Sequence, residues 1–251
     1  MEQFDKVASL YSRVRPSYPQ RVYQEMVNFN EGNLFSFAAD IGCGPGQSTE
    51  GLIPIAQKVI GIEPGDHLRE EASKHYPRIS FYKGTGEQTN LSNHEVDLVT
   101  IAAAFYWMDR EQVLAEVNRI LKDKGIFCIY RYFHPVVEDR AVDQVIQKHL
   151  VNYWNQYRED RFVRKDDSDQ LMEQSGYFSK VKSLKIDHVI PMRVSDFMGF
   201  LGSTAYVSLY LESIGSDADA YLGSLEDELR PHAINDYLDI NFDIRMVCAK
   251  K

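Results

Sequence analysis

Three glycines stand within five residues in the segment Asp40-Ile41-Gly42-Cys43-Gly44-Pro45-Gly46, directly after a run of strand-forming residues. Glycine accepts positive φ and has no side chain to hold a ligand away, so Gly42, Gly44 and Gly46 predict a tight strand-to-helix turn against a cofactor. Asp40 places a carboxylate at the end of the strand. A loop that binds a diphosphate more often has an apolar residue there, because the next helix N-terminus holds the anion. The segment alone therefore leaves the identity of the cofactor open.

A second acid, Glu63, ends the next strand-like run, 21 positions after Gly42. That separation lets a carboxylate accept both hydroxyls of an adenosine ribose, whereas the structural alternative is an exposed glutamate at a strand end. Further on, the turn Gly84-Thr85-Gly86-Glu87 follows the third such run. Turns after parallel strands face one crevice in an open α/β sheet. We therefore expect Glu87 to lie within reach of the adenine amino group.

These residues need a parallel sheet to bring them together, and the sequence between Phe35 and Tyr132 predicts one, because short β-rich runs alternate with amphipathic segments. The clearest helix is Arg110–Leu121, whose apolar residues recur at helical spacing. Two more helices, at Phe4–Arg13 and Gln20–Asn28, flank the elbow Arg15-Pro16-Ser17-Tyr18-Pro19. We expect strands at Phe37–Ile41, Lys58–Ile62, Ile79–Lys83, Val96–Ile101 and Ile126–Tyr132.

The second half of the chain has longer helical stretches that are rich in aromatic residues, which predicts a cap. Strand-like runs at Lys180–Ile190 and Ile240–Ala249 would complete the sheet as an antiparallel pair at one edge. The expected fold is α/β, a Rossmann-like, seven-stranded, mostly parallel sheet with helices on both faces. We expect a single domain, with an N-terminal helical lid at residues 1–34, a cofactor-binding core at 35–135, and the remaining strands with a helical cap at 136–251.

The composition limits the classes of partner. The 251 residues, 44% of them hydrophobic, can bury one substantial core. A net charge of -9 opposes attraction to nucleic acids or anionic membranes, and no apolar run reaches membrane-spanning length. The three cysteines are widely separated and the seven histidines form no metal-binding pair, so neither a disulfide framework nor a metal site is expected. These features predict a cytoplasmic protein, monomeric or homodimeric.

The segment Asp40–Gly46, then Glu63, then Arg119–Gly125 before the fifth strand resemble, in order, the motif series of class I S-adenosylmethionine-dependent methyltransferases. The resemblance implies S-adenosylmethionine as cofactor, a ligand whose sulfonium, methionine and adenosine groups call for acids. It implies that Asp40 meets the methionine ammonium and that Glu63 holds the ribose. The resemblance also implies that the cofactor contacts the three glycines and a further set of residues: Tyr11, Arg15, Cys43, Pro64, Thr85, Gly86, Glu87 and Ala103.

The likeness extends to the small-molecule branch of that family, the type 11 methyltransferases that include trans-aconitate methyltransferase. The N-terminal residues Phe4, Ala8 and Tyr11, together with the elbow, resemble the lid of this branch. The segment Ala103–Asp109 resembles the branch after its fourth strand, where the position of Tyr106 is often histidine. Methyl transfer by in-line displacement depends on alignment and on the exclusion of water, and it needs a base only when the acceptor must lose a proton.

Several residues are candidates for the acceptor side. Tyr106 is expected to line the site and act there, whereas Trp107 more often serves packing. His134 is the histidine placed to act as a base, although a loop histidine is the simpler interpretation. The elbow could close over the ligands or serve as a plain hinge. Arginine suits carboxylates, which points to a small carboxylic acid. The candidate acceptor contacts are Tyr18, Tyr106, Arg131 and Arg193, with Arg15 as a further cation.

Two other functions fit the same scaffold. A nicotinamide- or flavin-dependent oxidoreductase shares the strand, the glycine loop and the ribose acid. However, the spacing Gly42-x-Gly44-x-Gly46 is one residue shorter than the dinucleotide fingerprint, and Asp40 stands where that fingerprint is usually apolar. A non-catalytic cofactor-binding protein is the third possibility, because the demands of catalysis here are mostly geometric. The leading prediction is an S-adenosylmethionine-dependent methyltransferase that acts on a small molecule.

Overall fold

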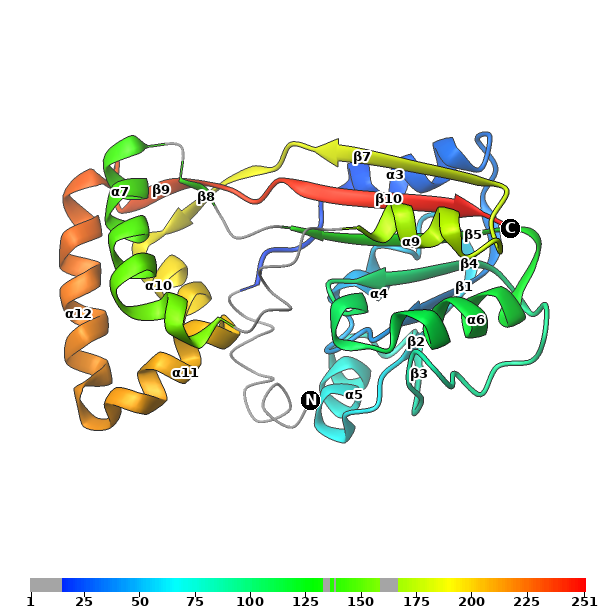
Figure 1. The fold of residues 1–251 in the computed structure, drawn as a ribbon, viewed down its shortest axis with the longest axis horizontal. Helices are drawn as coiled ribbons and strands as arrows, with labels where there is room; N and C mark the ends of the chain where they lie inside the picture. The colour runs from blue at the N-terminus through cyan, green and yellow to red at the C-terminus, as the bar shows by residue number, and fades with distance from the viewer. Residues whose placement is uncertain (1–14, 133–135, 138, 159–166) are drawn as a thin grey trace.

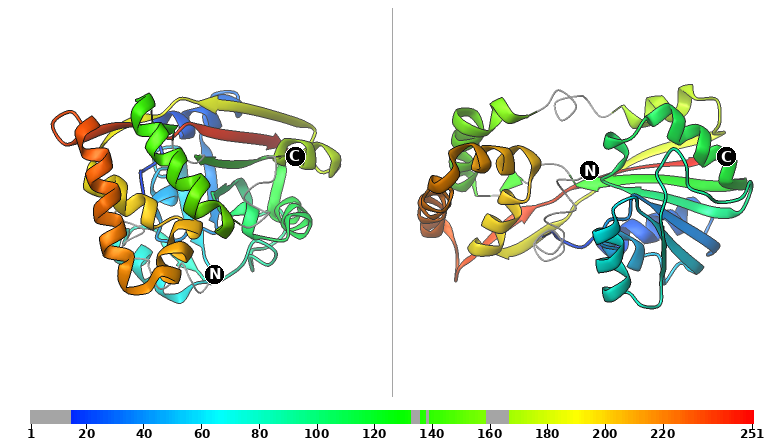
Figure 2. Two further views of the ribbon diagram at one scale, coloured as in Figure 1. Left: turned by 60° about the vertical axis from the view of Figure 1, so that its left-hand side comes forward. Right: turned by 90° about the horizontal axis from the view of Figure 1, so that it is seen from below.

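A computed structural model describes residues 15–132, 136–137, 139–158 and 167–251. These residues form two lobes, which Figure 1 and the right-hand view of Figure 2 show side by side. The larger lobe is built on a wide sheet. The smaller one, which we call the cap lobe, gathers helices around a short sheet. The expected helix Phe4–Arg13, with Tyr11, and the candidate base His134 lie outside the described residues.

The large sheet has seven strands in the order β3-β2-β1-β4-β5-β10-β7. Strands β1 to β5 pair in parallel, and β10 runs antiparallel to both β5 and β7. The expected parallel sheet with an antiparallel pair at one edge is confirmed. The strands are β1 (Phe35–Ile41), β2 (Ala56–Ile62), β3 (Ser80–Tyr82), β4 (Val96–Ala102), β5 (Leu121–Tyr132), β7 (Lys180–Ile186) and β10 (Ile244–Lys250).

Helices cover both faces of this sheet because its strands are apolar on both sides. In β5, Ile126 and Cys128 pack with residues of α3 (Gln20–Phe29), whereas Phe127 and Ile129 pack with residues of α6 (Arg110–Ile120) and α9 (Ser168–Gln174). Alternate residues of a strand point to opposite faces, so one strand contributes to both cores. The other helices of this lobe are α4 (Gln47–Glu50), α5 (Asp66–His75) and η1 (Phe105–Trp107).

The two strands expected at Lys180–Ile190 and Ile240–Ala249 are each broken in the structure. The first divides into β7 and β8 (Val189–Arg193), and the second into β9 (Tyr237–Asn241) and β10. At the break the Phe242 amide donates a hydrogen bond to the His188 carbonyl at 2.7 Å, so the two segments of the chain stay side by side between the large sheet and the cap lobe. Strands β8 and β9 then join β6 (Val136–Val137) in a second sheet, in the order β6-β9-β8.

The cap lobe has a hydrophobic core of its own, in which Trp154, Phe197, Phe200 and Phe242 are fully or almost fully buried. The carboxyl end of β5 faces this lobe, since the Tyr132 ring lies 5.4 Å from the Phe242 ring. The helices of the cap lobe are α7 (Arg140–His149), the π-helical η2 (Leu150–Trp154), η3 (Asn155–Tyr157), α10 (Val194–Gly202), α11 (Ala205–Ile214), η4 (Gly215–Asp217), α12 (Ala218–Leu229) and η5 (Arg230–His232).

Candidate functional site

The glycine loop after β1 folds over the end of β2. The amides of Gly42 and Cys43 both donate to the Ile62 carbonyl, at 2.7 and 3.2 Å. Gly42 has a φ of 65°, and a Cβ there would lie 2.7 Å from the Cβ of Ala104, so only glycine fits without a shift. Gly44 has a φ of 55°, yet no atom of the described residues lies within 4 Å of the position that its Cβ would take. The turn therefore presents bare backbone at Gly44, as a ligand-binding loop requires.

Asp40 lies beneath this loop. Its side chain is 0% exposed, and its carboxylate accepts hydrogen bonds from Ser48 Oγ at 2.6 Å, Thr49 Oγ1 at 2.8 Å and Thr100 Oγ1 at 2.7 Å. Burial raises the pKa of Asp40, while these three hydroxyls act to lower it. We expected this carboxylate to meet the ligand's ammonium group. In the structure it ties α4 and β4 together under the loop, and these bonds satisfy the buried carboxylate.

Glu63 connects the loops after β1 and β2. One carboxylate oxygen accepts from the Gly44 amide at 3.0 Å and the other from the Gly65 amide at 2.9 Å. The side chain is 7% exposed. An ionised carboxylate only accepts hydrogen bonds, and its two oxygens offer about four lone-pair sites in total. The two acids that the sequence singled out thus lie at adjacent strand ends, with Glu63 beside the bare backbone of Gly44.

The turn after β3 joins the same edge of the sheet through Met108. A Cβ added at Gly86 would lie 2.5 Å from the Met108 sulfur, and one added at Gly42 would lie 2.8 Å from the Met108 methyl group. Met108 therefore packs between the two turns. The sequence carried no signal for this role, because an apolar residue after a strand is ordinary. Cys43, partly buried Pro64 and Thr85 lie in these three loops as well.

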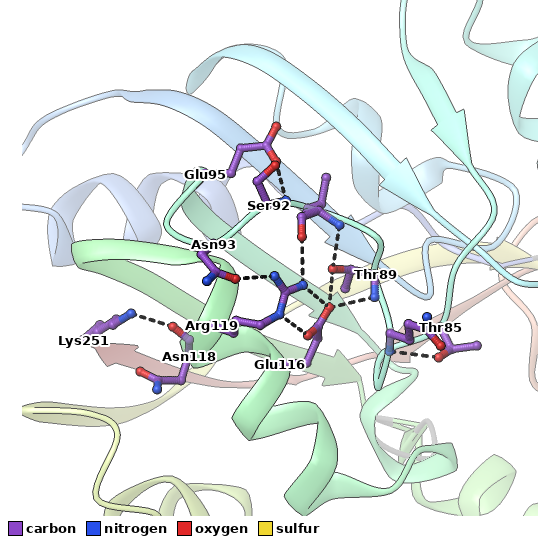
Figure 3. Close-up of polar contacts among 11 residues, drawn as sticks. Thr85, Thr89, Ser92, Asn93, Glu95, Glu116, Asn118, Arg119 and Lys251 are labelled. Carbon is purple, nitrogen blue, oxygen red and sulfur yellow. Dashed lines mark hydrogen bonds and ion pairs between the residues drawn. The ribbon is translucent and has the colours of Figure 1, made fainter.

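The polar groups of the β3 turn are held within the protein. Thr85 Oγ1 accepts from the Gln88 amide at 3.1 Å, and a Glu87 carboxylate oxygen accepts from the Asp109 amide at 2.9 Å. Glu87 thus contacts the start of α6. Residues beyond this turn are fixed to α6 by Glu116, which accepts from Thr89 Oγ1 at 2.6 Å (Figure 3).

Arg119 completes this anchor. Its guanidinium donates to both carboxylate oxygens of Glu116, at 2.7 and 2.8 Å, and to the carbonyl of Leu91 at 2.8 Å. It also reaches Asn93 Oδ1 at 2.7 Å, as Figure 3 shows. Burial opposes ionisation of Glu116, but the hydrogen bonds from Arg119 and Thr89 bring the pKa of this carboxyl below its usual value. The segment that follows β3 is therefore fastened to the rigid core of the lobe.

The turn after β4 brings Tyr106 to this edge. Ala103 has a φ of 55°, which is uncommon for a residue with a Cβ, and its amide donates to the Tyr130 carbonyl at 2.9 Å. Helix η1 follows, and Tyr106 within it is partly buried. The Tyr106 hydroxyl lies 3.0 Å from Ser168 Oγ, and the Arg131 guanidinium lies 3.9 Å from the centre of its ring. Ser168, fully buried at the start of α9, was missed because its segment looked like a charged loop.

The other two arginines of the sequence prediction lie elsewhere. Arg15 donates to the Ser203 carbonyl at 3.0 Å and lies 4.8 Å above the Phe200 ring, so it contacts the cap lobe rather than the glycine loop. Arg193 is exposed and donates to the Tyr237 hydroxyl at 3.1 Å. These two residues pair at the end of the cap sheet that is farther from the large sheet, so Arg193 is not part of this edge.

Tyr18, a candidate acceptor contact in the elbow, lies near the end of β5. Its ring is 4.7 Å from the Tyr130 ring and 5.6 Å from the Tyr132 ring. In the cap lobe the Arg158 guanidinium lies 5.6 Å from the ring of Tyr206. Burial raises the pKa of Tyr206 to about 12, although the charges of Arg158 and Arg15 act to lower it.

Two classes of site are not found in the part of the chain that the structure describes. No group of three or more His, Cys, Asp or Glu side chains there is arranged to hold a metal ion. Within the same residues, every helix is too short or too polar to cross a bilayer.

Comparison with known proteins finds methyltransferases, in agreement with the family that the sequence motifs resemble. Residues 39–129 match the family model described as a methyltransferase domain. A Dictyostelium discoideum protein whose name assigns it to the methyltransferases is 24% identical over 256 residues, which cover 100% of this chain and 95% of the relative. A Saccharomyces cerevisiae protein, named as S-adenosylmethionine-dependent, is 28% identical over 184 residues, covering 70% of this chain and 62% of the relative.

Among solved structures, a protein of Anaeromyxobacter dehalogenans described as a type II methyltransferase superposes with a TM-score of 0.75. It is 23% identical in sequence, and the superposition covers 94% of this chain and 97% of that one. This likeness includes the regions before and after the residues that the family model matches. The sheet, the glycine loop and these comparisons together identify the chain as a class I S-adenosylmethionine-dependent methyltransferase.

Proposed function

We propose that this chain binds S-adenosylmethionine at the loop 40–46 and transfers its methyl group to a small molecule that carries a carboxylate. The observation that carries the proposal is the hydrogen bond between the Gly44 amide and Glu63, 3.0 Å long. It closes a bare backbone turn against a carboxylate at the ends of two adjacent parallel strands. We further propose a cytoplasmic enzyme, monomeric or homodimeric, without nucleic-acid or membrane partners, in keeping with its net charge of -9.

The residues present fit this cofactor. Among the described residues no atom crowds the Cβ position of Gly44, and Glu63 places a carboxylate, the acceptor that ribose hydroxyls need, beside that backbone. Asp40, which does not reach the surface, supports the loop through Ser48 and Thr49 of α4. We therefore assign it a positioning role, in place of the ammonium contact that the resemblance implied.

A nicotinamide or flavin dinucleotide fits less well. Its diphosphate would need the N-terminus of the helix that follows the glycines, and α4 has only four residues, the last of which is Glu50. Two carboxylates, Asp40 and Glu63, also lie under and beside the loop. A diphosphate there would meet negative charge without a long helix dipole to offset it.

The sulfonium of the bound cofactor supplies the electrophilic methyl carbon, so the protein has to align the acceptor and exclude water. Tyr106 stands after β4, where an acceptor would approach from the side of the cap lobe. The Arg131 guanidinium above its ring is a planar fork that suits a carboxylate, and Ser168 fixes the Tyr106 hydroxyl. A carboxylate acceptor loses no proton on methylation, so this arrangement needs no general base.

The test is a screen of acceptors by release of S-adenosylhomocysteine from purified protein, with matched panels of carboxylic acids, amines and phenols. We expect turnover with a carboxylic acid, and a KM roughly 10–100-fold higher in Arg131→Gln, the loss of one charge-assisted contact. Arg193→Gln is the control, because this exposed arginine lies outside the site and its loss should leave KM unchanged. Turnover confined to amines or phenols would refute the acceptor class. Binding of S-adenosylhomocysteine without turnover on any panel would favour a non-catalytic protein.

A further inference from the structure

Two of the three cysteines, distant in sequence, meet in the large sheet. Cys128 of β5 and Cys248 of β10 stand directly opposite each other in the antiparallel pairing, and their sulfur atoms are 2.8 Å apart. Residues opposite each other in such a pair have Cα atoms about 4.5 or 5.5 Å apart. Both spacings fall within the range of about 4.4–6.8 Å that a disulfide spans. The backbone therefore places the two thiols where they can be joined without moving either strand.

Both thiols point to the same face of the sheet. Each side chain is 0% exposed, in a core cluster that includes Met26 of α3 and Tyr130. Cys43, the remaining cysteine, belongs to the glycine loop, where its sulfur packs against Gly61. The site is thus a buried pair beneath α3, separate from the cofactor loop.

We propose that Cys128 and Cys248 form a modification site, at which hydrogen peroxide or another small hydroperoxide joins them in a disulfide across β5 and β10. In the first step one sulfur attacks the peroxide, whose O–O bond breaks, giving a sulfenic acid and water. In the second step the other sulfur displaces the hydroxyl group, which leaves as water with the proton of that thiol. The sum converts two thiols and one hydrogen peroxide into one disulfide and two molecules of water.

The surroundings set the rate and the kind of oxidant. Burial and the neighbouring thiol raise the pKa of Cys128, so little thiolate is present and the reaction is slow. Oxidant has to enter through local opening of the packing beneath α3. A small neutral peroxide can enter in this way, whereas oxidised glutathione is too large and charged. The site should therefore respond to peroxide and not to glutathione disulfide.

The cross-link would hold the base of the cap lobe. Strand β5 leads from the large sheet toward the cap lobe, and β10 returns from it, as Figure 1 shows. The two cysteines are 120 positions apart, and the chain between them contains the whole described cap lobe. A disulfide that closes so long a loop removes much of the entropy of the unfolded chain. We expect the unfolding temperature to rise by about 5–10 °C on oxidation.

The test treats purified protein with hydrogen peroxide, blocks remaining thiols with N-ethylmaleimide in denaturant, and digests with trypsin for mass spectrometry without reductant. Before alkylation, the disulfide should lower the mass of the intact protein by about 2 Da, the mass of two hydrogen atoms. The digest should contain the peptides 125–131 and 246–250 as one species, which dithiothreitol separates. The same treatment with glutathione disulfide should give no linked species.

Cys43→Ser is the matched control, since it removes a buried cysteine and should leave the linked peptides unchanged. Cys128→Ser and Cys248→Ser should each abolish them, together with the rise in unfolding temperature. Because a buried serine can impair folding, the comparison of oxidised with reduced wild-type protein tests the proposal without either variant. The proposal fails if both thiols are still alkylated after peroxide has oxidised the partly buried Met108, if they become sulfinic acids without a link, or if the link involves Cys43.

Discussion

Replacement of Glu63 by alanine tests the proposed ribose contact most sharply. The Glu63 carboxylate accepts from the amides of Gly44 and Gly65, and in the proposed complex it also accepts from two ribose hydroxyls. A hydrogen bond to a charged group contributes about 1.5–3 kcal/mol, so two of them amount to about 3–6 kcal/mol. Water that enters the vacated space recovers part of this loss. We expect Glu63→Ala to weaken cofactor binding by about 1–3 kcal/mol, which is roughly 5–150-fold in Kd.

The assay is calorimetric titration of the apoprotein with S-adenosylhomocysteine. Glu63→Gln should fall between wild type and Glu63→Ala, because the amide keeps one acceptor and loses the charge. Glu70→Ala is the control, an exposed glutamate on the neighbouring helix α5, and its Kd should equal that of wild type. Thermal unfolding without ligand checks that each variant is folded. An unchanged Kd in folded Glu63→Ala would show that the ribose does not lie at the end of β2.

Three further substitutions test other parts of the account. Tyr106→Phe should lower turnover and leave the Kd for S-adenosylhomocysteine within about twofold, because it removes the hydroxyl that contacts Ser168 and keeps the ring. A fall in cofactor affinity alone would place Tyr106 away from the acceptor. Asp40→Ala should cost about 2–5 kcal/mol in urea unfolding, since three buried hydroxyls lose their acceptor; a cost below about 1 kcal/mol would contradict its positioning role. Glu116 has a pKa below its usual value of 4.5, so its stabilising effect is complete above that pH and is lost as pH falls through the lowered value. The free energy of unfolding in urea should therefore fall less steeply at acid pH in Glu116→Gln than in wild type. If it falls equally in both proteins, ionisation of Glu116 does not stabilise the fold.

The sheet could be predicted because its strands carry their own signals. The runs that became β1, β2 and β4 are short, largely apolar and bounded by turns. This pattern is typical of parallel strands that are buried on both faces of a sheet. The breaks that separate β7 from β8 and β9 from β10 could not be placed, because both runs remain strand-like throughout. They follow from a second hydrophobic core, in the cap lobe, which takes up the later half of the first run as β8 and the earlier half of the second run as β9.

The site was predicted at the level of residue types and less well at the level of contacts. Glu63 and the glycines lie together because their spacing reflects one strand and one turn. Asp40 was given a ligand contact because the sequence does not show that Thr100, 60 positions away, reaches its carboxylate. Arg193 lies at the far end of the cap sheet, beside Tyr237, which the sequence does not show, because position along a chain does not tell which end of a strand faces the site.

The central claim is that the loop 40–46 binds a sulfonium cofactor or its demethylated product. It is tested most directly by calorimetric titration of one preparation of the protein with S-adenosylhomocysteine and, separately, with NAD. The structure predicts saturable binding of S-adenosylhomocysteine with one site per chain and no heat of binding for NAD, because a short α4 and two carboxylates disfavour a diphosphate. Tight binding of NAD with no signal for S-adenosylhomocysteine would contradict the account.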